Sequence, residues 1–210
     1  MKTNLLLILT ALGALFFSGN QVTAKETLPN IVVIFIDDEG YGDVGCFGAT
    51  GFETPNLDQM ASQGMRFTNF YSGSAVCSPS RAALLTGCYP PRVGITKVLF
   101  PFDNIGMNQE ETTIAEMLKQ KSYVTAIVGK WHLGHQQEFL PLQHGFDEYL
   151  GLPYSNDMWP VHYNGKPVSS ENFLKEWKLN CPSLPLIDGN EKIEEISTLG
   201  DMAQLTTRYT

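Results

Sequence analysis

The stretch Asn30-Ile31-Val32-Val33-Ile34-Phe35-Ile36-Asp37-Asp38 decides the fold class. Its apolar part is almost entirely β-branched or aromatic, which is typical of a strand buried on both faces of a parallel sheet. A second run of this kind, Tyr123–Val128, ends at Gly129-Lys130-Trp131-His132. Because helical patterns lie between the two runs, the sequence predicts an α/β domain with a mostly parallel central sheet flanked by helices.

The spacing of apolar residues predicts four helices and leaves two stretches without a regular pattern. We expect Met65–Tyr71 to be a strand or an extended segment, and the chain from Pro153 onward to be rich in loops. The expected helices run from a Thr54 cap and Pro55 to Gly64, from the Cys77-Ser78-Pro79 start to Gly87, from Thr112 or Thr113 through Leu118, and over Ser197–Thr210.

Composition excludes several classes of protein. The 210 residues contain 14 Lys and Arg against 22 Asp and Glu, a net charge of −8, which argues against a nucleic-acid partner held by phosphate neutralisation. The four cysteines, at positions 46, 77, 88 and 181, form no Cys-x-x-Cys pair, so neither a disulfide scaffold nor a structural zinc site is expected. The sequence is that of a globular protein that can still bind an anion locally.

The first 24 residues have the pattern of a cleaved signal peptide. Lys2 precedes the apolar run Leu5–Phe17, and Val22-Thr23-Ala24 places small residues at the cleavage positions. The run is shorter than the roughly 20 residues that span a bilayer, so no stable membrane span is expected. No asparagine begins an Asn-x-Ser/Thr acceptor, which favours a bacterial periplasmic or secreted protein over a lysosomal one.

Asp37 and Asp38 follow the first expected strand, at the edge of the sheet where α/β proteins bind ligands. Two neighbouring carboxylates repel each other unless a cation lies beside them, and Ca²⁺ takes six to eight oxygen ligands. Two interpretations remain open at this point: a metal site, or two solvated carboxylates that cap a turn.

Lys130 and His132 follow the second expected strand and, two residues apart in an extended segment, would point to the same side. A fixed cation beside an imidazole suits the binding of an anionic group and the movement of a proton. A surface lysine and a structural histidine are the alternative.

Cys77-Ser78-Pro79-Ser80-Arg81 places a cysteine at the start of a helix, with an arginine one turn later. The amides of a helix N-terminus favour an anion, and a guanidinium can bind two oxygens of a phosphate or sulfate. The same surroundings would lower the pKa of a thiol, so a thiolate nucleophile is an alternative, as is a structural cysteine.

These segments together resemble the sulfatase family. Cys77-Ser78-Pro79-Ser80-Arg81 fits the family's Cys-x-Pro-Ser-Arg element, and Gly129-Lys130-Trp131-His132-Leu133-Gly134 is similar to its second element. Asp37-Asp38 resembles the metal-binding opening, and Gly151–Asp157 resembles the arylsulfatase A type. The resemblance implies an alkaline-phosphatase-like sandwich, of which residues 25–210 are the N-terminal part, truncated at the C-terminus.

The resemblance also implies a mechanism. Cys77 would be oxidised to formylglycine by a formylglycine-generating or anaerobic sulfatase-maturing enzyme, and its hydrate would attack the sulfur of an aryl or carbohydrate sulfate ester. Asp37, Asp38 and residue 77 would bind Ca²⁺, less often Mg²⁺. Arg81 would stabilise the hydrate, Lys130 and Ser155 would contact the sulfate, and His132 would take a proton when sulfate is eliminated.

The family also needs a second Asp/Asn metal pair, a further His and a further Lys, and residues 158–210 offer no convincing match. We therefore expect the 210-residue chain alone to be inactive. Two alternatives to a sulfatase remain: a metal-dependent phosphohydrolase of the same fold, which would use a Ser or Thr nucleophile, and a non-catalytic relative that binds sulfate or carbohydrate.

Overall fold

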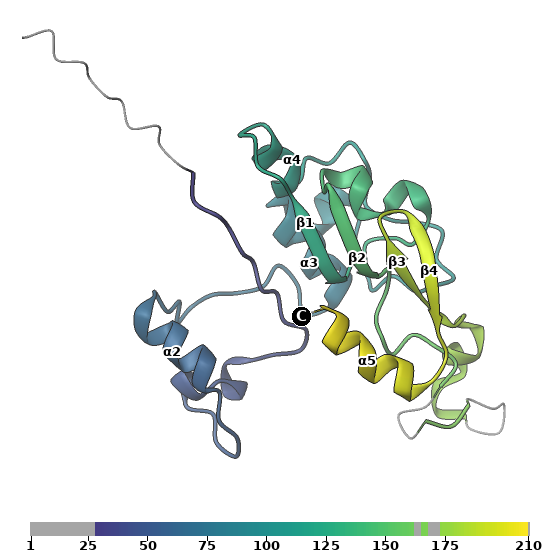
Figure 1. Ribbon diagram of the computed structural model, residues 1–210, viewed down its shortest axis with the longest axis horizontal. Coiled ribbons are helices and arrows are strands. Elements are labelled where there is room, and N and C mark those ends of the chain that lie inside the picture. The colour runs from purple at the N-terminus through teal and green to yellow at the C-terminus, as the bar shows by residue number, and fades with distance from the viewer. Residues whose placement is uncertain (1–27, 162–164, 168–172, 210) are drawn as a thin grey trace, which may run out of the picture. The chain divides into compact units, whose positions relative to one another are not determined.

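The computed structural model describes residues 28–161, 165–167 and 173–209, which fall into two compact units divided between Gly40 and Tyr41. The second unit contains the regular elements, which Figure 1 labels. Its helices are α2 (Pro55–Gln63), α3 (Cys77–Thr86), α4 (Ile114–Lys119) and α5 (Leu199–Tyr209), and its strands are β1 (Ala126–Lys130), β2 (Glu148–Leu152), β3 (Leu184–Asp188) and β4 (Glu191–Ile196). Short 3₁₀ helices lie at Tyr41–Asp43, Gly45–Phe47, Pro90–Val93, Gln137–Phe139, Pro141–His144 and Phe173–Asn180.

The four strands form one sheet in the order β1-β2-β3-β4. β1 and β2 run parallel, with Ala126 opposite Glu148 and Lys130 opposite Leu152, whereas the β2–β3 and β3–β4 pairs are antiparallel. The α/β class is therefore as predicted, but the sheet is mixed rather than mostly parallel. The difference arises in the C-terminal part, where a hairpin joins the sheet.

The β3–β4 hairpin corrects the prediction of a loop-rich flank after Pro153. A two-residue turn, Gly189-Asn190, joins the strands, and Gly189 has a φ of +60°, which glycine adopts without steric cost. The Gly189-Asn190 pair is a recognised hairpin signal, and the apolar residues of β3 precede it.

Residues 30–36 correct a second prediction, because they form no strand in the part of the chain that the structure describes. They belong to the first compact unit, and most of their side chains are exposed, with Val32 83% accessible. β-Branched residues favour an extended backbone by local sterics, but a strand also needs a neighbour, and the local sequence does not supply one.

The predicted helices are confirmed, with two differences of detail. Thr54 does not cap α2; its hydroxyl instead accepts a hydrogen bond from the Gly45 amide at 2.8 Å and donates one to Asp58 at 3.2 Å. Met65–Tyr71, expected to be a strand or an extended segment, contains no strand and includes a turn at Thr68-Asn69. No helix among the described residues is both long and apolar enough to cross a bilayer.

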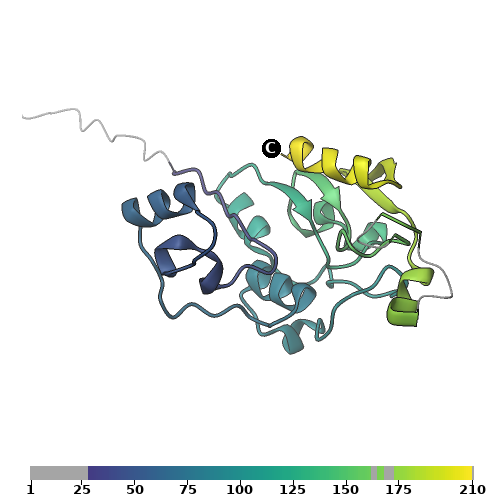
Figure 2. The same cartoon turned by 90° about the horizontal axis from the view of Figure 1, so that it is seen from below.

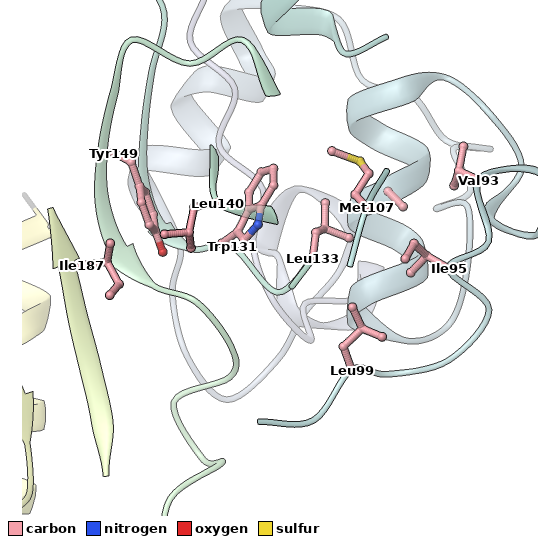
Figure 3. Packing of buried hydrophobic residues seen from close by; sticks show 10 residues of the cluster. Val93, Ile95, Leu99, Met107, Trp131, Leu133, Leu140, Tyr149 and Ile187 are labelled. Atoms are coloured by element: carbon pink, nitrogen blue, oxygen red, sulfur yellow. The ribbon is translucent and has the colours of Figure 1, made fainter. Parts of the chain in front are cut away.

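The core consists of two apolar clusters on opposite faces of the sheet. Tyr149 of β2 and Ala82 of α3 both belong to the first cluster, which Figure 3 shows around Trp131 and Leu133. Leu152 of β2 packs with Leu205 of α5 in the second cluster. Because side chains alternate along a strand, one strand contributes to both clusters, and α3 and α5 cover opposite faces (Figure 2).

Two facing glycines bring β1 and β2 together next to the candidate site. Gly129 and Gly151 are paired in the parallel register, and Gly129 has a φ of +102°. A Cβ atom added to Gly151 would lie 1.8 Å from the Gly129 carbonyl oxygen, which no real structure tolerates. Both positions therefore require glycine.

Candidate active site

Cys77 is the first residue of α3 and is half-buried, whereas Ser78, Pro79 and Ser80 behind it are buried. Val76 before it is extended, and the Ser80 amide donates to the Val76 carbonyl at 3.1 Å, which starts the helix. At the other end, Gly87 has a φ of 67° and its amide binds the Ala83 carbonyl, a common helix termination. The buried first turn fixes the cysteine at a helix N-terminus, as the sequence predicts.

Arg81 lies one turn further along α3 and links this helix to the end of β1. Its Nη1 donates a hydrogen bond to the Lys130 carbonyl oxygen at 2.5 Å, across 49 residues of sequence. Lys130, the last residue of β1, in turn directs its Nζ to the Ser155 hydroxyl at 3.2 Å. The structure thus brings together three of the residues that the sequence selects from separate segments.

His132 is completely buried, and its Nε2 lies 2.7 Å from the Leu99 carbonyl oxygen. A carbonyl can only accept, so Nε2 carries the proton. The expectation that Lys130 and His132 point the same way assumed one extended segment, but the strand ends at Lys130 and His132 has a left-handed φ of 62°. The regular alternation of side chains does not extend to His132, which contacts a different segment.

Leu99 is a contact that sequence reasoning missed. Its amide donates to the Ser78 hydroxyl at 3.1 Å, while its carbonyl accepts from His132. One backbone residue therefore joins the residue that follows Cys77 to the imidazole. Backbone groups occur at every position, so no residue type in the sequence marks this contact.

Backbone pairing beyond β1 and β2 holds the segment after Lys130 in place. The Trp131 amide donates to the Leu152 carbonyl at 2.9 Å, and the His132 amide donates to the Pro153 carbonyl at 3.1 Å. The buried Trp131 indole donates to the Phe139 carbonyl at 2.7 Å. These bonds keep residues 130–132 beside residues 152–153, which explains why Lys130 reaches Ser155.

His135 and Tyr154 lie close to these residues and were also missed. Their rings are edge to face, with centroids 6.0 Å apart. Burial lowers the pKa of His135, against the opposing charges of Asp103 and Glu138. Neutral at physiological pH, His135 adds no fixed charge to the site.

The two predicted carboxylate ligands, Asp37 and Asp38, lie in the first compact unit, so their place relative to Cys77 stays a prediction. The chain bends at this pair, and Asp38 has a φ of 56°. Carboxylates suit Ca²⁺ in kind, but two are fewer than the six to eight ligands it takes. In the part of the chain that the structure describes, no three His, Cys, Asp or Glu side chains gather as a metal site.

Several groups of the second unit are of the kinds that bind an oxyanion, and three of the residues that carry them are linked by hydrogen bonds. Arg81 and Lys130 supply positive charge, Ser155 supplies a hydroxyl, and the N-terminus of α3 supplies a positive dipole end. Cys77, half-buried at the helix start, is the group in this set that can be modified or can react.

Comparison with known proteins assigns the family. The sulfatase family model matches residues 29–181. Human arylsulfatase A is 53% identical over 135 residues, which cover 63% of this chain and 27% of the human protein. Mouse N-acetylgalactosamine-6-sulfatase is 47% identical over 183 residues, which cover 83% of this chain and 34% of the relative.

The fold comparison agrees. The crystal structure of PsFucS1 sulfatase from Pseudoalteromonas sp. matches with a TM-score of 0.68 and 29% identity, covering 83% of this chain and 37% of that one. The chain thus spans about a third of the length of these relatives, and its α/β architecture is that of their alkaline-phosphatase-like fold. With the family model matching most of its residues, this chain belongs to the sulfatase family.

Proposed function

We propose that the full-length protein hydrolyses sulfate esters of aryl alcohols or carbohydrates. The observation that carries the proposal is the linkage of Arg81, one turn into the helix that begins with Cys77, to Lys130 and through Lys130 to Ser155. Membership of the sulfatase family and the names of the relatives support this reaction class, and one relative is a sulfatase of a carbohydrate substrate.

Cys77 is proposed to be the modified residue, converted to formylglycine by a formylglycine-generating or anaerobic sulfatase-maturing enzyme. Such an aldehyde, once hydrated, supplies an oxygen nucleophile and a second hydroxyl through which sulfate can later be released. A thiol would lack this exit, because its sulfate adduct has no neighbouring hydroxyl that can collapse.

The chain's own residues have distinct tasks in this proposal. The Lys130 ammonium neutralises charge on the sulfate oxygens, and Ser155, held by Lys130, adds a hydroxyl contact. Arg81 stabilises the oxygen groups at residue 77 from one turn along α3. One well-placed donor of this kind is worth roughly a hundred- to thousandfold in rate.

His132 is proposed to accept a proton during sulfate release. Because Nε2 is committed to the Leu99 carbonyl as a donor, Nδ1 is the ring atom able to accept. The bond to Leu99 fixes the tautomer, as a backbone carbonyl commonly does for a catalytic imidazole.

Asp37 and Asp38 would contribute to holding Ca²⁺, or less often Mg²⁺, together with residue 77. Their oxygens suit either ion in kind, and the ion would supply further positive charge toward sulfate. The N-terminal pattern supports export to the periplasm or the medium, although residues 1–24 lie outside the described part of the chain.

The test is mass spectrometry of the peptide containing Cys77 from the full-length protein, combined with turnover of 4-nitrophenyl sulfate and 4-nitrophenyl phosphate. We expect an aldehyde, in which one oxygen replaces sulfur and two hydrogens, and faster cleavage of the sulfate ester. Intact cysteine with sulfate affinity but no turnover would indicate a binding protein. Faster phosphate turnover would indicate a phosphohydrolase.

A further inference from the structure

Lys178 is an almost fully buried lysine that the proposed chemistry does not use. It lies in the 3₁₀ segment Phe173–Asn180, and 1% of its surface is accessible. Its Nζ donates to the Asp157 carbonyl at 2.6 Å and to the Val161 carbonyl at 3.1 Å, and lies 5.6 Å from the Trp177 ring centroid. A buried ammonium is costly unless such bonds satisfy it.

The two carbonyls belong to the segment that directly follows Ser155. Within this segment, the Met158 amide donates to the Ser155 carbonyl at 3.0 Å, which makes Ser155 the first residue of a turn. Met158 and Trp159 are buried in the second core cluster. The Ser155–Val161 segment is therefore anchored by the apolar packing of Met158 and Trp159 and by a charged donor at two of its carbonyls.

Ser155 is also the partner of Lys130. Its hydroxyl lies 3.2 Å from the Lys130 Nζ, two residues before the Asp157 carbonyl that Lys178 binds. A shift of the turn would move this hydroxyl relative to Lys130, because the backbone between positions 155 and 157 is short.

We propose that Lys178 is a positioning residue that holds the Ser155–Val161 segment so that Ser155 and Lys130 face the sulfate group together. The proposal rests on the proposed function for the identity of the ligand. Its structural part, the fixing of the segment by Lys178, can be tested without it.

The experiment uses the full-length protein and three variants. Lys178→Met keeps an apolar stem of similar length but removes the ammonium, so the Asp157 and Val161 carbonyls lose a charged donor. Lys178→Arg retains charged donors. Lys192→Met is the matched control, because Lys192 is an exposed lysine of β4 that bridges to Glu195.

We expect Lys178→Met to raise KM for 4-nitrophenyl sulfate and the inhibition constant of inorganic sulfate about tenfold. Tenfold corresponds to about 1.4 kcal/mol, the size of one hydrogen bond to a charged group. The kcat of Lys178→Met, normalised to the formylglycine content of the protein, should stay within about twofold of the wild-type value, since residue 77 and His132 are unaffected. Lys178→Arg should recover most of the sulfate affinity, and Lys192→Met should match the wild type.

Hydrogen exchange in the peptide covering residues 155–161 gives the independent readout. Faster exchange in Lys178→Met, but not in Lys192→Met, supports the proposal even if the wild type hydrolyses no sulfate ester, an outcome that would refute the proposed function alone. Unchanged exchange, or a lowered melting temperature with unchanged KM and sulfate inhibition, would overturn the role of Lys178.

Discussion

The imidazole of His132 is bound to the backbone carbonyl of Leu99 at 2.7 Å, although 33 residues separate the two in the sequence. The amide of the same leucine binds Ser78, next to Cys77. The position of the imidazole relative to the start of α3 thus depends on one peptide segment that contributes no side-chain chemistry.

Arg81→Lys tests the link between α3 and β1. Lysine cannot reproduce the planar guanidinium that donates to the Lys130 carbonyl. In the full-length protein we expect kcat/KM for a sulfate ester to fall about a hundredfold. Steady-state kinetics, normalised to aldehyde content, give the answer; Arg208→Lys on α5 is the control, and equal kinetics in both variants would contradict the assigned role.

Ser155→Ala tests the partner of the Lys130 ammonium. Loss of the hydroxyl removes one hydrogen-bond acceptor from Lys130 and one proposed contact to the sulfate, so we expect KM to rise by about five- to tenfold. Ser62→Ala, an exposed serine of α2 bonded to Gln59, is the matched control. A variant indistinguishable from the control in KM and sulfate inhibition would remove Ser155 from the site.

His144 makes stability dependent on pH. Burial lowers the pKa of this fully buried imidazole from 6.5 to about 4, against the opposing charge of Glu116. The unfolded chain therefore binds a proton between about pH 6.5 and pH 4 that the folded chain does not, and the stabilisation present above pH 6.5 is lost as the pH falls through this window.

The expected loss is on the order of 3 kcal/mol in the free energy of unfolding between pH 7 and pH 4. Urea denaturation of the full-length protein and of His144→Gln at several pH values measures it. The variant should show a shallower pH dependence in this window. Parallel curves for the two proteins would rule out His144 as the cause.

Thr113→Ala tests the start of α4. The Thr113 hydroxyl accepts from the Glu116 amide at 3.2 Å and donates to the His144 carbonyl at 2.7 Å, and the Glu116 carboxylate accepts from the Thr113 amide at 2.7 Å. We expect a loss of about 2 kcal/mol in the free energy of unfolding, from the cap and the buried hydrogen bond. Thr113→Ser should retain most of the wild-type stability, because serine keeps the hydroxyl. A serine variant as unstable as the alanine variant would show that the methyl group, not the hydroxyl, matters.

The helices of this chain are predictable because their signals are local. Gly64, Gly87 and the Thr113–Glu116 capping box mark boundaries that the structure confirms. Strand pairing depends on partners that are distant in the sequence. The run Asn30–Ile36 has the composition of a buried strand and yet forms none in the described structure. The β3–β4 hairpin arises where loops were expected, and β2 arises where no element was predicted.

The candidate site likewise contains residues that the sequence identifies and contacts that only the fold reveals. Cys77, Arg81, Lys130 and Ser155 are identifiable from residue type and from the resemblance of their segments to one family, and the structure brings Arg81, Lys130 and Ser155 into contact. The contributions of Leu99 and Lys178 act through backbone carbonyls and amides. Such contacts become visible only when the fold is known.

The pairing of Gly129 with Gly151 has a practical consequence for altering substrate preference. Since neither glycine tolerates a side chain, the spacing between the strand ends that carry Lys130 and Ser155 is set by main-chain atoms alone. Laboratory evolution could therefore randomise surface loops elsewhere while the proposed sulfate-binding geometry is inherited unchanged. We expect libraries that include positions 129 or 151 to consist largely of misfolded variants.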